Sequence, residues 1–410
     1  MAGYYFNLPQ ITQLTIPQQA ALNEVKQIAL SGGPGTGKSV VSLWRHISNH
    51  RQNKKSLLLT YATSLARYLK VCCASQNQEA AANVGRSYKD RNRIHSANWN
   101  EIIIDEAQDL SRDYYNPIIK VKISYGADDA QILYPDKSIT QRELKELFAD
   151  NVDYVLDKNF RSTQRIMQFA KTAFPNAYIP QSTIDRLADK VGELPIMLIA
   201  GANQWIEEQK RYEMSNEKQD NAIIAIIQQL TTDTHNIAVL VPWKKDAVYF
   251  ETIIKEKIQD YSIYYEDDDV FPNGCEEIKN IHITTFKSAK GLEFDTVIIP
   301  NIFGLFKIDA NIVVEGITPQ NKEELQKVIF EILGIQREIS DKQRIINLQI
   351  RMEQIEKFEQ GIKNINGIIM RTDMTWKDLY VGTTRARSNL YIISSYDIPR
   401  LHSITDKQIL

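Results

Sequence analysis

The chain has few cysteines, no long apolar run and almost no net charge, and each absence argues against a class of protein. Its three cysteines, Cys72, Cys73 and Cys275, form neither a paired framework nor a zinc-binding spacing, so a reducing cytoplasm is expected. No apolar segment is long enough to cross a membrane. Residues 1–10 lack the basic and apolar parts of a secretory signal, so we expect no leader.

Charged side chains are abundant but nearly balanced. The sequence has 49 Lys and Arg against 51 Asp and Glu, which gives a formal net charge of −2. This balance argues against a broadly basic nucleic-acid coat, but not against a local basic groove. The 410 residues, 43% of them hydrophobic, suit two or three globular domains. The acidic run at residues 266–269 is expected to be a solvated loop.

The most informative motif is GGPGTGKS at Gly32–Ser39, which fits the phosphate-binding loop G-x-x-x-x-G-K-[ST] at every fixed position. An apolar run at Ile28–Leu30 precedes it and a helix-like run at Val40–Trp44 follows, as the motif requires. Lys38 would reach the β- and γ-phosphates, and Ser39 would hold Mg²⁺. The alternative is a glycine-rich turn that binds nothing. We expect the nucleotide to contact Gly32, Gly33, Pro34, Gly35, Thr36, Gly37, Lys38 and Ser39.

A second motif, Glu101–Asp109, predicts a buried strand that ends in acids. Asp105 at its carboxyl end would hold hydrated Mg²⁺, and Glu106 would activate or orient the attacking water. Ligands of open α/β sheets bind at the carboxyl ends of strands, which is where this pair would lie. The alternative is a solvated acidic turn, which the phosphate-binding loop makes less plausible.

Apolar runs alternate with segments of helical spacing, and this alternation favours parallel α/β layers. Helical spacing is found, for example, at Thr163–Phe174 and Asp220–Leu230. The expected strands are Ser56–Tyr61, Ile102–Asp105, Val121–Ser124, Leu194–Ile199, Ile237–Val241, Ile281–Phe286, Thr296–Pro300 and Leu390–Ser394.

In the order of its motifs, the chain resembles superfamily 1 helicases of the UvrD/Rep type. The resemblance spans nearly the whole sequence and depends on the series of motifs rather than on any one string. Besides the phosphate-binding loop, the matching segments are Leu14–Gln18, Leu59–Ala66, Asp105–Asp109, Ala127–Gln131, Asn159–Thr163, Thr284–Asp295 and Leu379–Arg387.

This resemblance implies two RecA-like motor domains, at residues 1–150 and 151–410, with ATP and Mg²⁺ bound between them. Nucleotide state would open and close the cleft, and repeated closure would move the protein along a single strand. The strand is expected to be DNA and the movement 3′ to 5′. Gln18 would read the adenine.

The resemblance also assigns roles around the phosphates. Gln131 would sense the γ-phosphate, and Arg161 and Arg385 would neutralise it from the second domain. The alternatives are a surface ion pair for Arg161 and a contact with the carboxyl end of a helix for Arg385. Glu293, beside Gly291, would contact the ribose or close the site; otherwise it is a plain surface glutamate.

Single-strand binding needs aromatic platforms and polar groups that follow the backbone. Tyr61 and Phe286 are the candidate platforms, with core packing at a strand end as the alternative for both. The candidate contacts are Thr60, Tyr61 and Ser64 in the first domain and Thr285, Phe286 and Lys287 in the second.

Several departures from the family pattern make duplex unwinding less secure than ATP hydrolysis. The intervals from Ser39 to Asp105 and from Arg161 to Thr284 are short for the usual inserted domains. Relatives also place tryptophan after the Gln131 motif, which is missing here, and many have histidine where this chain has Phe286.

One insertion is present instead. Residues 318–365 carry apolar residues at helical spacing, which predicts a helical hairpin within the second domain. It would pack on its own domain, or act as an arm that docks a protein partner or guides the strand. The chain shows no nuclease constellation. The alternative to a translocase or helicase is therefore an ATPase that senses nucleic acid and regulates a partner such as a nuclease; a nucleotide-binding scaffold without chemistry is a third, weaker hypothesis.

Overall fold

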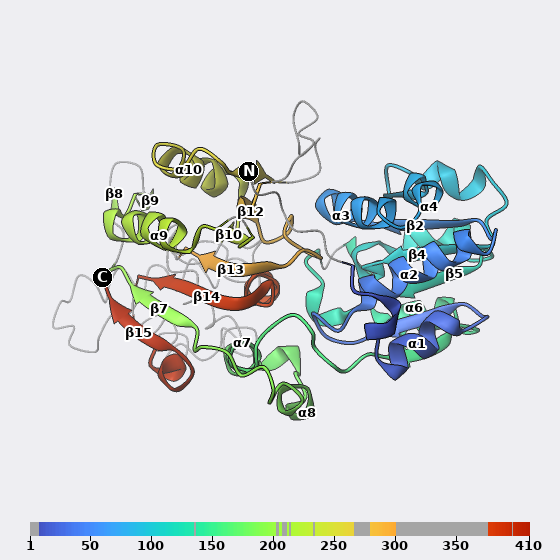
Figure 1. Ribbon diagram of the computed structural model, residues 1–410, viewed down its shortest axis with the longest axis horizontal. Helices are drawn as coiled ribbons and strands as arrows, with labels where there is room; N and C mark the ends of the chain where they lie inside the picture. Colours follow the sequence, from blue (N-terminus) through green and yellow to red (C-terminus); the bar gives the residue numbers. More distant parts are fainter. Residues whose placement is uncertain are drawn as a thin grey trace, which may run out of the picture.

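A computed structural model describes residues 8–134, 137–201, 205–206, 211–212, 215–232, 234–265, 279–300, 376–395 and 397–410. Figure 1 shows this part of the chain as two lobes side by side, each built on a sheet with helices around it. The helical insertion expected at 318–365, the acidic run at 266–269 and Cys275 lie outside the described residues.

The first lobe contains a six-stranded sheet in which every pair of neighbours is parallel. Its central strands are apolar and buried on both faces, as a covered parallel sheet requires. Across the sheet, the order is β3 (Val84–Arg86), β2 (Ser56–Thr60), β4 (Glu101–Asp105), β5 (Ile123–Gly126), β1 (Ile28–Ser31) and β6 (Val152–Val155).

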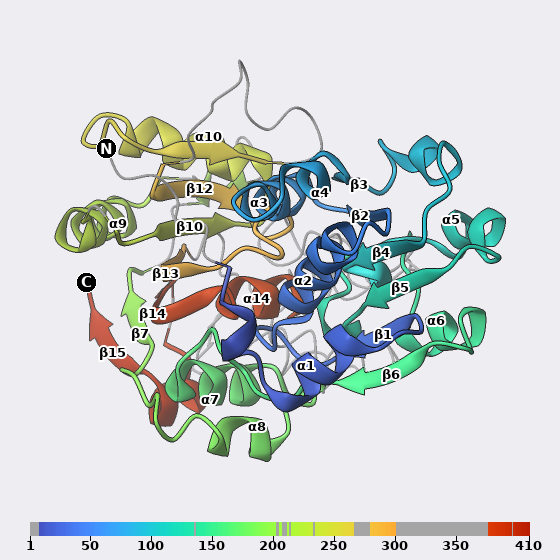
Figure 2. The same cartoon turned by 45° about the vertical axis from the view of Figure 1, so that its right-hand side comes forward.

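Helices cover both faces of this sheet (Figure 2). Two of them begin with a recognisable capping signal. At the start of α1, the Thr15 side chain accepts a hydrogen bond from the Gln18 backbone, and the Gln18 side chain accepts one from the Thr15 backbone. Thr140 and Glu143 form the same reciprocal pair of bonds at the start of α6. No helix of the described residues is long and apolar enough to cross a membrane. The helices are α1 (Ile16–Asn23), α2 (Lys38–Arg51), α3 (Thr63–Ala74), α4 (Gln78–Ala82), α5 (Arg112–Tyr115) and α6 (Gln141–Leu147).

The second lobe contains a seven-stranded, all-parallel sheet. Two apolar clusters cover its faces, one around Phe286 and Phe294 and the other around Ile227 and Phe250. The strand order is β11 (Ser262–Tyr264), β12 (Ile281–Thr285), β10 (Ile237–Val241), β13 (Phe294–Ile299), β14 (Ala386–Ser394), β7 (Ile196–Ile199) and β15 (Asp406–Ile409).

The helices of this lobe are α7 (Gln164–Ala173), α8 (Gln181–Asp185), α9 (Glu217–Leu230), α10 (Lys244–Ile254) and α14 (Trp376–Thr383), with a small antiparallel pair formed by β8 (Trp205–Ile206) and β9 (Arg211–Tyr212). The α14 helix contacts the first lobe at the turn Asp129–Gln131, so the two lobes meet there.

The predicted fold class is confirmed: two parallel α/β domains are flanked by helices, as two RecA-like domains would be. The expected boundary after residue 150 is wrong, because β6 at Val152–Val155 pairs with β1 in the first sheet. The chain leaves the first sheet only after this strand, whose alternating burial is typical of a sheet edge.

Candidate nucleotide site and nucleic-acid interface

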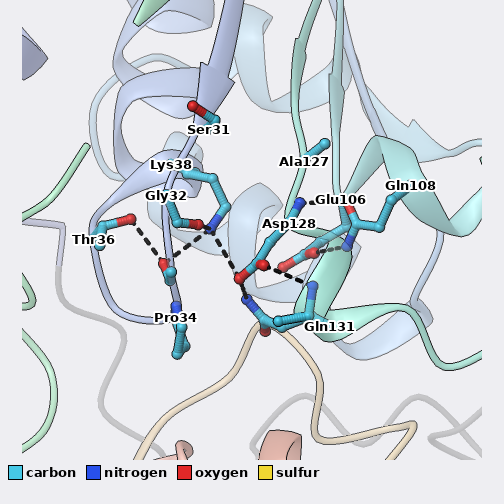
Figure 3. Close-up of polar contacts among 12 residues, drawn as sticks. Ser31, Gly32, Pro34, Thr36, Lys38, Glu106, Gln108, Ala127, Asp128 and Gln131 are labelled. Carbon is cyan, nitrogen blue, oxygen red and sulfur yellow. Dashed lines mark hydrogen bonds and ion pairs between the residues drawn. The ribbon is translucent and has the colours of Figure 1, made fainter. Parts of the chain in front are cut away.

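The phosphate-binding loop connects β1 to α2, as the motif predicts. Gly32 has φ of +139°, and a Cβ there would lie 2.1 Å from the carbonyl oxygen of Leu156, so the loop needs glycine at this position. The Lys38 ammonium donates to the carbonyls of Gly32 at 2.6 Å and Gly33 at 3.0 Å (Figure 3). The loop thus folds around its own lysine.

Asp105 ends β4 on the carboxyl side of the sheet, two strands away from β1. It is 1% exposed, and its Oδ2 atom has no hydrogen-bond partner. Burial, followed by repulsion from Glu106, raises the pKa of Asp105 to about 7, although a hydrogen bond from Ser39 opposes the shift. A buried carboxylate oxygen without a partner, beside a serine hydroxyl, is the oxygen donor set that Mg²⁺ prefers. These residues therefore fit the metal that the sequence predicts.

Glu106 follows in a left-handed conformation, with φ of +53°, which turns it away from the strand direction. Gln108 Nε2 donates to Glu106 Oε2 at 2.6 Å, and the Lys290 ammonium lies 3.5 Å from the same oxygen. Burial alone would raise the pKa of Glu106, but Lys290 and then Lys38 outweigh it and lower the pKa to about 2. Glu106 is thus an anion at neutral pH.

Gln131 lies at the junction between the two domains. Its Nε2 donates to Asp128 Oδ2 at 2.6 Å, and the same Asp128 oxygen lies 3.8 Å from the Lys38 ammonium (Figure 3). Its Oε1 accepts from Arg385 Nη2 at 2.9 Å. One amide therefore connects the phosphate-binding lysine, through Asp128, to an arginine of the second domain.

Arg385 is 1% exposed, and all its donor atoms have partners. Besides Gln131, Nε donates to Val381 O at 3.0 Å and Nη1 to Leu292 O at 3.4 Å. Burial, followed by repulsion from Arg161, lowers the pKa of Arg385 to about 9, which leaves the guanidinium charged at neutral pH. Arg385 thus contacts the last turn of α14 and also lines the cavity beside the phosphate-binding loop.

Arg161 comes from the segment between the two sheets. Its Nε donates to Glu293 Oε2 at 3.1 Å, and its Nη1 to Thr384 O at 3.3 Å. A Cβ on Gly35 would lie 2.8 Å from the Arg161 Cβ, so this arginine packs directly on the phosphate-binding loop. The Arg161 ion pair lies inside the site, with its side chain 11% exposed, rather than on the surface. Arg387, at 3.8 Å, also contacts Glu293.

A single cavity of about 370 Å³ connects these groups across the two domains. It is lined from the first domain by the phosphate-binding loop and Glu106, and from the second by the arginines. The predicted residues Asp105, Gly32 and Gly33 are not among its lining residues. Of the predicted nucleotide residues, the cavity is lined by Gln18, Pro34, Gly35, Thr36, Gly37, Lys38, Ser39, Glu106, Gln131, Arg161, Gly291, Glu293 and Arg385.

Gln18 reaches the loop directly, because its Nε2 donates to Thr36 O at 2.9 Å. On the opposite side, Gly291 has φ of +80°, and a Cβ there would lie 2.6 Å from a methyl group of Leu65 in the first domain. Glycine at this position therefore lets the two domains approach closely beside the cavity.

The predicted nucleic-acid residues divide into buried and accessible ones. Thr60 is buried at the end of β2, and Ser64 donates to Ser288 O across the domain junction at 2.5 Å. Thr285 is buried and bonded to Ser288 Oγ at 3.0 Å. Phe286 is 1% exposed within the apolar cluster of the second domain, so its predicted role as a stacking platform is wrong, and core packing is its role here.

Tyr61 and Lys287, by contrast, meet in an aromatic group at the junction. The Tyr61 ring lies 5.3 Å from Tyr134 and 5.9 Å from Tyr88, and the Lys287 ammonium lies 4.8 Å from the centre of the Tyr134 ring. Tyr88 is 48% exposed. We call Tyr61, Tyr88 and Tyr134 the tyrosine cluster. It combines stacking surfaces from the first domain with a cation from the second, as a single-strand site requires.

Several residues of these sites were not predicted as site residues. Asp128, Asp109 and Lys290 lie inside motifs of the family pattern, so their position was a signal that went unused. Tyr88 and Tyr134 lie in segments without a motif, and only the fold brings them beside Tyr61.

Comparisons with known proteins give limited similarity. No family model matches the chain. Over 211 residues it is 25% identical to a protein of Acanthamoeba polyphaga mimivirus that is named, provisionally, as ATP-dependent DNA helicase R568; the match covers 49% of this chain and 29% of that protein. The chain thus spans less than a third of that relative's length.

Solved structures with overall similarity include the arterivirus nonstructural protein 10 helicase, with a TM-score of 0.38 and 10% identity over 95% of this chain and 63% of that one. The structure of the PRRSV helicase gives a TM-score of 0.37 and 9% identity over 93% of this chain and 54% of that one. These scores are too low to support an argument about this chain.

Proposed function

We propose that this protein is an ATP-driven motor that moves along single-stranded nucleic acid, and that it hydrolyses ATP between its two α/β domains. The observation that carries the proposal is the cavity of about 370 Å³, which brings the phosphate-binding loop, Glu106 and two arginines of the second domain together. Groups from both domains around one site would couple nucleotide state to domain closure.

In this mechanism the chain supplies positioning and charge. The loop amides and Lys38 bind the β- and γ-phosphates at the start of α2. Glu106, held as an anion, accepts a hydrogen bond from the attacking water. Arg161 and Arg385 neutralise the charge that develops on the γ-phosphoryl oxygens, and a well-placed arginine is worth about 10³–10⁵ in rate.

Asp105 and Ser39 would hold the Mg²⁺ that accompanies ATP. The free, buried Asp105 Oδ2 and the adjacent serine hydroxyl support this assignment. When bound, Mg²⁺ neutralises charge on the β- and γ-phosphate oxygens. The metal would replace the proton that burial favours on Asp105.

For the nucleic acid, we propose the tyrosine cluster together with Lys287 as the contact surface. Ring stacking accepts any base, so binding would be independent of sequence. The provisional name of the mimivirus relative supports DNA as the strand. Membership of the UvrD/Rep type and 3′ to 5′ movement belong to the same proposal and depend on the resemblance in motif order. A cytoplasmic location is proposed from the three cysteines, which form no paired framework.

The test is steady-state ATP hydrolysis with and without oligothymidylate, followed by strand separation on tailed duplexes. We expect turnover to rise with the oligonucleotide and to vanish in Lys38→Ala and Glu106→Ala. Normal turnover in either variant would overturn the assignment of the site. Stimulation without strand separation would favour the alternative function, an ATPase that senses nucleic acid and regulates a partner.

A further inference from the structure

Lys290 extends from the second domain into the first and is surrounded there by acceptors. Its ammonium lies 2.7 Å from both carboxylate oxygens of Asp109 and 2.6 Å from the carbonyl oxygen of Gln131. Glu106 Oε2 lies 3.5 Å away. All of these partners belong to the first domain, so the ammonium keeps them only while the two domains are closed.

This contact is fully removed from water. The side chains of Lys290 and Asp109 are each 2% exposed. A buried ion pair of this kind contributes little net stability, and its best-attested use is to fix one arrangement over another. In the arrangement of the two domains seen here, Ser64 of the first domain also donates to Ser288 O of the second. Ser288 lies two residues before Lys290. The pair therefore selects the closed arrangement of the domains.

We propose that Lys290 is a positioning residue that fastens the two domains together at Asp109 and, in doing so, holds Glu106 for catalysis. Glu106 has a neutral partner in Gln108 and a cation from the other domain in Lys290. Opening the domains withdraws that cation, so Glu106 is correctly placed only in the closed state. This inference rests on the proposed function and adds a regulatory element to the same site.

The same segment leads to the nucleic-acid surface. Lys287, whose ammonium lies over the ring of Tyr134, is three residues before Lys290. The two lysines belong to one tight turn, in which Ala289 N donates to Thr285 O and Lys290 N donates to Lys287 O. A strand bound at the tyrosine cluster would press on this turn. Lys290 is thus placed to transmit nucleic-acid binding to Glu106.

The kinetic test compares Lys290→Met, Asp109→Asn and the control Lys407→Met. Lys407 belongs to an ion pair with Asp397 at 3.0 Å in the second domain, but that pair is partly exposed and remote from the cavity. We expect Lys290→Met to lower kcat per folded molecule by about 10–100-fold, as loss of an outer partner of a catalytic group does, with KM for ATP unchanged. Asp109→Asn should act in the same direction, and the control should not.

A distance measurement tests closure without relying on catalysis. Spin labels at Asp113→Cys and Glu217→Cys, both exposed and on opposite domains, report the separation by pulsed electron resonance, with Cys275 replaced by serine. We expect Cys72 and Cys73 to react little with the label, because they are 2% and 0% exposed, and labelling of the protein without the two introduced cysteines checks this. We expect a longer or broader distance in Asp109→Asn and in Lys290→Met, and no change in Lys407→Met.

Unchanged distances together with unchanged kcat in Asp109→Asn would overturn the inference, even if Lys290→Met failed to fold. The inference would also be overturned if total activity fell only in proportion to the folded fraction and the distance did not change. A purely structural lysine predicts that result. If the wild type hydrolyses ATP without responding to oligothymidylate, the proposed motor function fails, while basal kcat and the label distance still decide the role of Lys290.

Discussion

Phe286 and Tyr61 allow a direct test of which aromatic side chain serves the core and which serves the nucleic acid. Phe286 is 1% exposed and packs so closely on Gly382 that a Cβ there would lie 2.6 Å from its ring. Phe286→Ala therefore opens a core cavity, and such changes lower the free energy of unfolding by about 3–5 kcal/mol. In a domain of this size that corresponds to about 6–20 °C in Tm.

Tyr61→Ala should have the opposite profile. Its ring is half-buried and lies 5.3 Å from the Tyr134 ring, so truncation removes stacking surface rather than core volume. Loss of one stacked base weakens single-strand binding by about 1–3 kcal/mol, which is about 5–150-fold in Kd. Tyr178, with 84% of its surface exposed in the second domain, provides the control Tyr178→Ala, which should change neither quantity.

The assays are thermal unfolding and fluorescence anisotropy with labelled oligothymidylate, both on the full chain. Phe286→Ala must be measured well below its own Tm, so that unfolding does not imitate lost affinity. Weaker strand binding by Phe286→Ala with an unchanged Tm would refute the assignment of Phe286 to the core. An unchanged Kd in Tyr61→Ala would remove the tyrosine cluster from the proposed interface.

Three further predictions follow from single contacts. Gly32→Ala should weaken ATP binding in a filter or calorimetric assay, because the new Cβ would lie 2.1 Å from Leu156 O and the loop would have to move. Arg385→Ala should lower kcat by about 10³-fold or more while sparing the Kd for ATP, and a defect in binding alone would contradict its role at the γ-phosphate. Asp246 is 0% exposed and has no ion-pair partner among the described residues; burial raises its pKa to about 7, although a backbone hydrogen bond from Trp243 opposes the shift. Because burial holds the folded-state pKa near 7, above the ordinary aspartate value, the fold loses stability as the pH rises from about 4 to 7 and the loss levels off above 7. Asp246→Asn should therefore raise Tm at pH 8, and a gain that did not shrink between pH 7 and pH 4 would count against this account.

The sequence predicted the interior of both sheets more fully than their edges. The strand β10 at Ile237–Val241 is buried along its whole length and appears as a continuous apolar run, so its bounds were predicted as observed, whereas β5, expected at Val121–Ser124, lies at Ile123–Gly126. The edge strands β3, β6, β11 and β15 were not predicted. The strand β6 alternates half-buried with exposed residues, and β15, Asp406–Ile409, is exposed throughout. Neither has the hydrophobic signal on which the prediction depended.

The candidate site divides in the same physical way. The loop and the acidic pair were predicted from their motifs, and the two arginines from the resemblance to the helicase family; the loop, Glu106 and both arginines line one cavity. A motif does not say which side chain at a strand end packs into the core of its own domain and which one contacts the other domain. That is why Phe286 was assigned to nucleic acid, and why Lys290, in the same motif, was overlooked although it carries the buried contact with Asp109.

Asp105 and Glu106 are consecutive carboxylates that the surrounding charges treat in opposite ways. Glu106 receives the nearby cations, above all Lys290, and its pKa falls to about 2. Asp105 keeps an oxygen without a partner, and its pKa rises to about 7. Two neighbouring carboxylates whose pKa values are shifted in opposite directions take different roles. Here Glu106 is a fixed anion, whereas Asp105 lacks a cation that would offset its burial. A divalent cation at Asp105 would supply that charge without disturbing Glu106, and because Lys290 comes from the second domain, we expect the division of roles to depend on closure.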